Sequence, residues 1–168
     1  RVIMVIAPIP ANEDARLAAL RDLLLLDTLP EVRYNNIVEY AAAEFNVPMV
    51  LISLVDNDRQ WFKASVGMDV CETSRDISFC GHAILAPETM VVRDALEDVR
   101  FMDNPLVLGE PHIRFYAGAP LVLPEGEIVG TLCLLDIEPR HFEPAELSSL
   151  GKLRSLVVEQ LMTGAVIV

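Results

Sequence analysis

An arginine, a cysteine and a histidine lie within eight residues of one another in the stretch ETSRDISFCGHAI, at positions 72–84. A cysteine nucleophile needs an imidazole within hydrogen-bond reach and a third group that orients the imidazole. Cys80 and His82 are two residues apart, and side chains with this spacing diverge by about 200° on a helix. Because the stretch is expected to begin a short helix, we predict no catalytic pair here, and instead residues of a pocket wall or of the core.

Arg75 is the residue of this stretch that is best suited to hold a ligand. A guanidinium at the mouth of a pocket can bind a carboxylate or a phosphate through paired hydrogen bonds. The alternative is a surface arginine that pairs with Asp76 or Glu72. The sequence leaves both interpretations open.

The cysteines and histidines give little support to a metal site. No CxxC or HxxxH spacing is present, so zinc would need the fold to gather Cys71, Cys80, His82 and Cys133. Three irregularly spaced cysteines also argue against a disulfide framework. We therefore expect no metal, and a reducing cytoplasmic compartment.

The composition is that of an acidic globular domain, with 52% hydrophobic residues, 23% charged residues and a net charge of −12. Such a charge disfavours contact with phosphate backbones, so we expect no nucleic-acid partner. No run reaches the ~18 consecutive apolar residues of a spanning helix, so we expect no membrane segment. The P-loop, GxSxG and dinucleotide-binding patterns are absent from the sequence.

Hydrophobic periodicity predicts the elements that must position these side chains. Apolar residues at helical spacing predict helices over 13–26, 31–45 and 144–162. Short apolar runs between turn residues predict strands over 49–56, 60–67, 90–94, 114–123 and 128–136. A short helix is expected between the second and third strands. Hairpins at both ends of the strand set indicate an antiparallel sheet in an α+β domain.

One domain, residues 12–162, accounts for all of these elements. We interpret residues 1–11 as a leader or a vector-derived segment and residues 163–168 as a tail. The opening RVIMVIAP lacks the full apolar region and the cleavage site of a signal peptide.

Several strings resemble the GAF domain, as found near the N termini of bacterial sensor histidine kinases and cyclic-di-GMP signalling proteins. They are LLDTLPE, ISLVDNDRQWFKASVG, ETSRDISFCGHAI, NPLVLGEPHIRFYAGAPLVLPEGEIVGTLCLLD and PRHF. The resemblance implies a central antiparallel sheet of five or six strands. It also implies terminal helices on one face and a ligand pocket under loops on the other, with an output domain after the last helix.

On this scaffold, aromatic and basic side chains of the mid-chain segments become candidate pocket residues. Trp61 and Phe62 alternate across one strand and Phe115 and Tyr116 across another, so one member of each pair faces the pocket. The expected ligand-binding residues are Trp61, Arg75, Phe79, Cys80, His82, Phe101, Arg114, Tyr116 and Cys133.

The resemblance leaves the ligand and any cofactor unknown, because the family uses one scaffold for unrelated ligands. Bilin-binding members carry a cysteine directly followed by a histidine, whereas Gly81 intervenes here. Haem-binding members offer an axial histidine, for which His82 and His112 are the available residues. The string typical of cyclic-nucleotide-binding members is missing.

The enzyme alternative is a free methionine-R-sulfoxide reductase. Cys71 and Cys80 superficially resemble the loop cysteines of such members, but the third cysteine, expected near Asn104, is absent, and Cys133 lies in a strand. A thiol reductase needs both a nucleophilic thiolate and a resolving partner. We therefore expect a non-catalytic module that senses a small molecule and dimerises in a bacterial signalling protein. The alternatives are the reductase, and a purely structural dimer with a vestigial pocket.

Surplus apolar surface on the terminal helices predicts a homodimer. The first helix presents leucines nearly all round, and the last helix carries leucines beyond its main stripe. A two-fold four-helix bundle would cover this surface, with Leu20 and Val157 at its seam. The alternative is that both helices bury the surplus within one chain.

Overall fold

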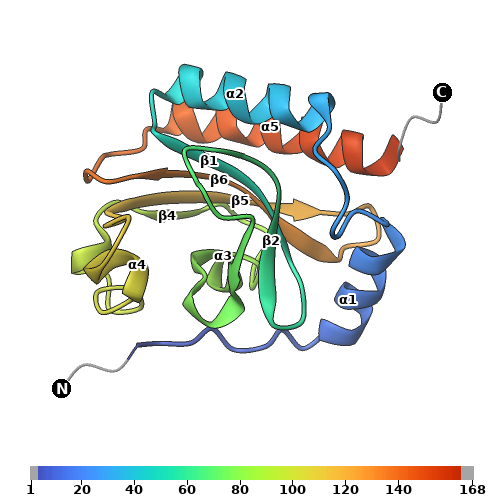
Figure 1. Cartoon of the computed structure of the whole chain (residues 1–168), viewed down its shortest axis with the longest axis horizontal. Helices are drawn as coiled ribbons and strands as arrows, with labels where there is room; N and C mark the ends of the chain where they lie inside the picture. Colours follow the sequence, from blue (N-terminus) through green and yellow to red (C-terminus); the bar gives the residue numbers. More distant parts are fainter. Residues whose placement is uncertain (1–3, 164–168) are drawn as a thin grey trace.

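A six-stranded antiparallel sheet forms the centre of the computed structural model, which describes residues 4–163 (Figure 1). The strands lie in the order β3-β2-β1-β6-β5-β4, and each neighbouring pair is antiparallel. Their bounds are β1 Met49–Val55, β2 Arg59–Val66, β3 Glu72–Ser74, β4 Met90–Val92, β5 Phe115–Val122 and β6 Ile128–Asp136. The predicted antiparallel sheet of five or six strands is confirmed.

The apolar run at 49–56 becomes a central strand because both faces of the sheet are covered. Every residue of β1 is buried, and β1 pairs with β2 on one side and β6 on the other. Side chains of a strand alternate between its faces. Val50 and Ile52 therefore join the core beneath the long helices, whereas Leu51 joins a second core beneath the loops.

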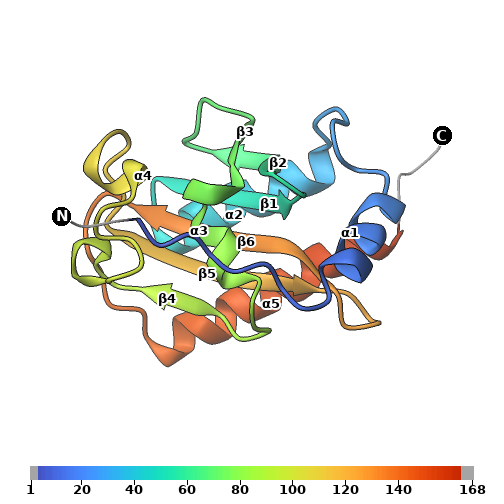
Figure 2. The same ribbon diagram turned by 90° about the horizontal axis from the view of Figure 1, so that it is seen from below.

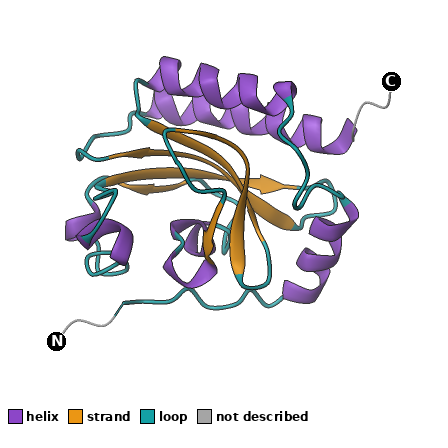
Figure 3. Cartoon of the chain, in the orientation of Figure 1, coloured by secondary structure: helices purple, strands orange, loops and turns teal. Residues whose placement is uncertain are grey.

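Helices α2 (Val32–Phe45) and α5 (Pro144–Thr163) lie side by side across one face of the sheet (Figures 1 and 3). Each helix buries one stripe at helical spacing. The stripe of α2 is the one that the sequence predicts, and it consists of Tyr34, Ile37, Val38, Ala41 and Phe45. Helices on a face of an antiparallel sheet confirm the α+β class.

The first helix is shorter than predicted and lies in another place. α1 (Glu13–Asp22) ends four residues before the expected end of the 13–26 helix. The chain turns there, with Leu24 and Asp27 in the left-handed region at φ 55° and 62°. α1 sits at one end of the sheet rather than beside α5 (Figures 1 and 2). The expected pairing of the first and last helices is therefore replaced by the pairing of α2 with α5.

The two side chains predicted at the dimer seam are buried inside the chain. Leu20 and Val157 both have 0% exposure, and both belong to the core cluster that also includes α2 residues. Both side chains are therefore buried within one chain, as in the alternative to a dimer seam at these two positions. Exposed apolar side chains remain elsewhere, notably Leu24 at 81% and Leu156 at 40%.

Short elements cover the other face of the sheet. They are α3 (Phe79–Ala83), α4 (Pro105–Leu108) and the 3-10 turns η1 (Arg75–Ile77) and η2 (Ala95–Glu97). The extended leader, residues 4–12, crosses α3 on its outer side (Figure 2). Within residues 4–163, no helix has the length and apolar character needed to cross a bilayer. Of the expected tail, residues 164–168 lie outside the described part.

Candidate functional site

The expected pocket lies between the sheet and α3, and its own side chains nearly fill it. A cavity of about 20 Å³ remains there. That volume is close to the space that one water molecule needs. Its walls come from β1, β2, α3, β5 and β6, and include Leu51, Phe62, Phe79, Cys80, Tyr116 and Cys133.

Aromatic rings pack closely beneath α3, although Phe101, a predicted site residue, does not itself line the cavity. The rings of Phe79 and Phe101 stack with centroids 4.0 Å apart and an interplanar angle of 6°. Phe79 also packs at 5.3 Å against the ring of Tyr116. Because aromatic side chains bury large apolar areas, this cluster stabilises the packing of α3 on the sheet.

The floor of the pocket carries a cluster of buried thiols and hydroxyls. Cys80 Sγ lies 3.0 Å from Thr131 Oγ1, 3.2 Å from Tyr116 Oη and 3.9 Å from Cys133 Sγ. Ser78 caps α3 by accepting a hydrogen bond from the Gly81 backbone N–H at 2.7 Å, which fixes the helix that carries Cys80. All three cysteines are free thiols, and only Cys71 is exposed.

The two buried thiols differ in acidity because of their neighbours. Burial raises the pKa of Cys80, but hydrogen bonds with Cys133, Thr131 and Tyr116 outweigh it and lower the pKa to about 7. Burial and the nearby charge at Cys80 raise the pKa of Cys133 well above its ordinary value. The hydrogen bonds that converge on Cys80 thus favour its thiolate, whereas burial disfavours the thiolate of Cys133.

Gly118 makes room for the hydroxyl of Tyr116. A Cβ atom at Gly118 would lie only 2.2 Å from Tyr116 Oη, so the tyrosine side chain lies over the glycine two residues along β5. This path brings the hydroxyl to Cys80 Sγ. Only glycine leaves the space that this arrangement requires.

Arg75 lies outside the cavity wall and is neutralised by a carboxylate of the same chain. Its Nη1 donates to Glu13 Oε2 at 2.5 Å and to the carbonyl oxygen of Asp56 at 3.0 Å, and the residue is 7% exposed. The partners expected from sequence, Asp76 and Glu72, are not the ones used, since Glu72 accepts from Arg59. The guanidinium thus fixes α1 to the loop before α3.

Glu13 is held by two guanidinium groups. Its carboxylate accepts hydrogen bonds from both Arg16 and Arg75. Burial raises the pKa of Glu13, but the hydrogen bonds and charges of these arginines outweigh it and lower the pKa to about 2. Arg16 is almost fully buried and also donates to the Val55 carbonyl at 2.6 Å, so this network fastens α1 to the end of β1.

Two further predicted site residues, Trp61 and Arg114, do not line the cavity. Trp61 belongs to the core on the helix-covered face, so its prediction as a pocket residue is wrong, and its neighbour Phe62 lines the cavity instead. Arg114 does not line the cavity, because its Nη1 donates to the carbonyls of Val107 and Ile113.

His82 faces the leader rather than the cavity. Its Nε2 lies 3.1 Å from the carbonyl oxygen of Val5, and its ring meets Phe101 edge-on at 4.9 Å. The prediction that the side chains of Cys80 and His82 diverge is confirmed, since Cys80 points inward to Thr131 and Tyr116.

Sequence reasoning missed Thr131, which contacts Cys80. It also missed several residues that line the cavity, among them Gln60, Thr73 and Ile113. Thr131 lies two residues before Cys133 on β6, so alternation places both side chains on the same face of the sheet. That signal was available once Cys133 was assigned to the pocket. The proximity of Thr131 to Cys80 could not be predicted, because the two residues are 51 positions apart in sequence and their contact depends on how α3 packs on the sheet.

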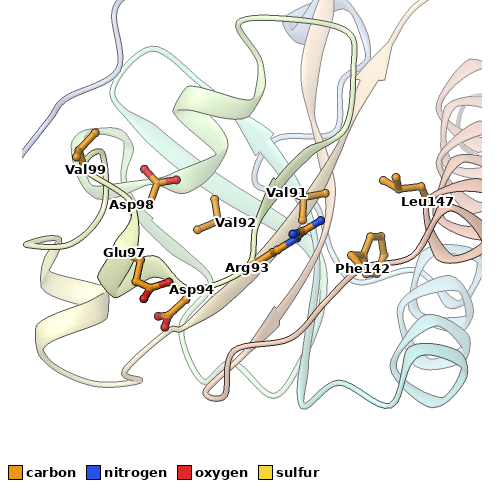
Figure 4. A pocket seen from close by; sticks show the side chains of 9 residues that line it. All are labelled: Val91, Val92, Arg93, Asp94, Glu97, Asp98, Val99, Phe142 and Leu147. Carbon is orange, nitrogen blue, oxygen red and sulfur yellow. The ribbon is translucent and has the colours of Figure 1, made fainter.

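A larger and more open groove of about 680 Å³ lies between β4 and the start of α5 (Figure 4). Phe142 and Leu147 form one side of it, and the carboxylates of Asp94, Glu97 and Asp98 lie on the other. No predicted site residue lines it. Among the described residues, no group of three or more His, Cys, Asp or Glu side chains is arranged to hold a metal ion.

This combination of sheet, covering helices and loop-covered pocket is typical of one known protein family. The family model of the GAF domain matches residues 30–160. The chain belongs to the GAF domain family. This GAF domain is also 47% identical, over 161 residues, to a cyclic di-GMP phosphodiesterase of Pseudomonas aeruginosa. The match covers 95% of the chain but only 27% of the length of that relative.

Solved structures support the fold assignment. The GAF domain of an Acinetobacter phosphoenolpyruvate-protein phosphotransferase superimposes with a TM-score of 0.64 at 20% identity, covering 89% of this chain and 94% of that one. A type II free methionine-R-sulfoxide reductase of Thermoplasma acidophilum gives a TM-score of 0.65 at 14% identity, covering 80% and 93%. At these identities, the likeness shows a shared fold.

Proposed function

We propose that this GAF domain is a non-catalytic regulatory module of a cyclic-di-GMP signalling protein, and that its partner is an output domain of the same polypeptide. The observation that carries the proposal is the 47% identity, over 95% of the chain, to a cyclic di-GMP phosphodiesterase of which it matches 27%. The chain corresponds only to the matched part of that relative. We therefore assign the catalytic activity of such a protein to its remaining part. The expected cytoplasmic location stays a prediction.

Exchange of segments tests the regulatory role. The matching segment of the Pseudomonas enzyme is replaced by this chain, or deleted, and hydrolysis of cyclic di-GMP is measured for each form. We expect the exchanged protein to keep its activity within a few-fold and the deletion to change it strongly. Equal activity in the native and deleted forms would contradict a regulatory role.

Small-molecule sensing is the second part of the proposal, and the face beneath α3 is the place for it. The cavity wall is mainly apolar, and its polar groups are the hydroxyls of Tyr116 and Thr73, the amide of Gln60 and two thiols, a lining like that of small-molecule sites. A ligand larger than water would need the cavity wall, including Phe79 on α3, to move, because only about 20 Å³ is free. Ligand binding therefore couples to movement of α3.

Retention and stabilisation measurements test the sensing role. The protein is purified without added ligand and its native mass is determined, and its melting temperature is measured with and without the small-molecule fraction of a bacterial extract. We expect a retained molecule or a raised melting temperature. The matched control is Ile113→Phe, which fills the cavity that Ile113 lines and should abolish both effects while the fold, checked by circular dichroism, is kept.

A structural module with a vestigial pocket is the second candidate, and the small cavity volume favours it. A protein with no retained molecule and no change in melting temperature would support this candidate over sensing. The reductase alternative has a separate test, the turnover of free methionine sulfoxide with thioredoxin. We expect no turnover, and turnover lost on Cys80→Ser would overturn the non-catalytic assignment.

Dimerisation is the third part of the proposal, and the outer face of α2 and α5 is the surface for it. These helices lie side by side and leave Val32, Tyr40, Leu156 and Met162 exposed at 71%, 57%, 40% and 52%. Exposed apolar groups on adjoining helices favour a two-fold contact. A dimer through this face would join the last helices of two chains, through which a change in the sheet reaches the output domains.

A further inference from the structure

Two thiols face each other at the floor of the cavity. Cys80 comes from α3 and Cys133 from β6, and their sulfur atoms lie 3.9 Å apart, close to van der Waals contact. Cys80 is 2% exposed and Cys133 is 0% exposed. A disulfide needs a sulfur–sulfur distance of about 2.05 Å, so α3 and β6 would have to bring the two sulfur atoms closer together before the bond forms.

The surroundings of Cys80 are more polar than those of a cysteine that only fills the core. A structural cysteine behaves as a small apolar group and needs no polar partner. Here the hydroxyls of Tyr116 and Thr131 and the thiol of Cys133 converge on one sulfur atom. Hydroxyls in such positions stabilise a thiolate, which is the form that reacts with oxidants.

The sulfur pair borders the small cavity beneath α3. Both cysteines line the cavity of about 20 Å³. Its rim includes Met68, Thr73 and Leu106, which are half-buried and therefore border on solvent. A small oxidant would reach the sulfur atoms when these wall residues move apart, whereas a bulky disulfide such as oxidised glutathione would need a far larger opening.

We propose that Cys80 and Cys133 form a reversible oxidation site that hydrogen peroxide closes to an intramolecular disulfide. The Cys80 thiolate attacks one peroxide oxygen, the O–O bond breaks, and the leaving hydroxide takes up the proton that Cys80 released to form water. The Cys133 sulfur then attacks the sulfenic acid at Cys80, the S–O bond breaks, and the second hydroxide leaves as water with the Cys133 proton. Two thiols thus lose two electrons and two protons, and one peroxide becomes two waters.

Closure of the disulfide would change the contacts of α3. Cys80 Sγ would leave Tyr116 and Thr131, which would then lose a hydrogen-bond partner inside the core. The same short helix carries His82, whose ring contacts the Val5 carbonyl of the leader. Oxidation at the floor of the pocket would therefore shift the leader on its outer side, and this does not depend on ligand sensing.

Intact-mass measurement tests the proposal in a Cys71→Ser background, which removes the exposed thiol and leaves the buried pair. The folded protein is treated with a series of hydrogen peroxide doses, unfolded, and alkylated. We expect a form lighter by two hydrogen atoms in which neither cysteine is alkylated, with a Cys80–Cys133 crosslink in the peptide map. Dithiothreitol should restore both alkylation sites.

Two results would overturn the proposal. In one, both cysteines remain fully alkylatable at doses that oxidise the same protein when it is unfolded. In the other, Cys80 passes to sulfinic acid without a crosslinked form. Cys133→Ala is the matched control: Cys80 should gain oxygen and the lighter form should be absent.

Tyr116→Phe separates a reactive role from a packing role, since it keeps the ring and removes the hydroxyl. Loss of one hydrogen bond that raises the thiol pKa by about one unit would lower the thiolate fraction at neutral pH about fivefold. We expect the oxidation rate to fall by about that factor and its pH midpoint to move upward. An unchanged pH midpoint would mean that the hydroxyl serves packing alone.

Discussion

Single side chains decide how closed the pocket is. Leu51, Phe62 and Leu135 reach the cavity from three different strands, and each is nearly fully buried. In a closely packed protein interior, the loss of even a few methylene groups lowers the stability of the fold. Substitutions at these positions should therefore report on packing directly.

Leu51→Ala should destabilise the fold by about 2–5 kcal/mol, since it removes buried atoms and enlarges the cavity that Leu51 lines. Urea unfolding measures the change in free energy. Val99→Ala is the matched control, because Val99 is 74% exposed and its truncation should change stability by less than about 0.5 kcal/mol. A similarly small loss for Leu51→Ala would mean that the central strand is not tightly packed.

Gly118→Ala should force the Tyr116 side chain out of its place, because the new methyl would overlap its hydroxyl. We expect a loss of about 1–3 kcal/mol from overpacking and a change in the near-ultraviolet circular dichroism of tyrosine. Gly151→Ala is the control. Its Cβ meets nothing within 4 Å on α5, so alanine there should stabilise the helix by roughly 0.5–1 kcal/mol. Equal effects of the two substitutions would contradict this account.

Residue types and alternation were enough to choose most of the pocket floor, but not its neighbours. Phe79, Cys80, Tyr116 and Cys133 all line the cavity as expected. The prediction that Trp61 lines the pocket was wrong because alternation along a strand does not tell which of its two faces meets the pocket. The pairing of β1 with β2 also shifts its register between Ile52 and Ser53. Partners distant in sequence, such as Glu13 for Arg75, depend on where α1 docks, which no local pattern encodes.

At the scale of elements, the contact between α1 and the loop before α3 depends on the charge of Glu13. Arg16 and Arg75 hold its carboxylate. The helices with strong apolar stripes were predictable, and α2 matches within a residue of its expected range. The end of α1 was not, because the leucines of LLLL continue the helical pattern while Leu24 adopts a left-handed backbone.

Stability should fall in acid through Glu13. Its pKa in the folded chain is about 2, below the ordinary value of 4.5, so its contribution is complete above pH 4.5 and is lost as the pH falls from there toward 2. Glu13→Gln should be less stable than the wild type near neutral pH, and the difference should shrink over that range. Urea unfolding at a series of pH values measures it.

Glu88→Gln, at an exposed position, is the control for this titration. It should leave the pH profile unchanged. A Glu13→Gln profile parallel to that of the wild type would mean that the contact of α1 with Arg75 carries no stabilising charge.

At the scale of the whole molecule, the two faces of the sheet are covered by different kinds of elements. One face is covered by α2 and α5, and the other by short elements and the leader (Figure 1). The thiol pair belongs to the core on the second face. The net charge of −12 opposes association of two copies at low salt, so an apolar contact must outweigh it.

Leu156→Glu should weaken the proposed dimer, because it would bury an unpaired charge between the last helices. Sedimentation at micromolar concentration measures the monomer–dimer ratio, with a shift of at least tenfold in the dissociation constant expected for a buried charge. Leu108→Glu adds the same charge at an exposed position of α4, on the opposite face of the sheet from α2 and α5, and should leave the ratio unchanged. A wild-type protein that sediments as a monomer would refute the dimer.

The overlap of Tyr116 with the space above Gly118 also has a consequence for sequence comparison. Because the tyrosine hydroxyl lies where a Cβ at Gly118 would stand, the two positions cannot vary independently. Among related chains, we expect the spacing Tyr-x-Gly to be inherited as a unit, and a larger residue at the second position to occur with a shorter one at the first. A Tyr-x-Gly pair on this strand, together with a cysteine in the helix facing it, would then mark the relatives that share the same buried thiol environment.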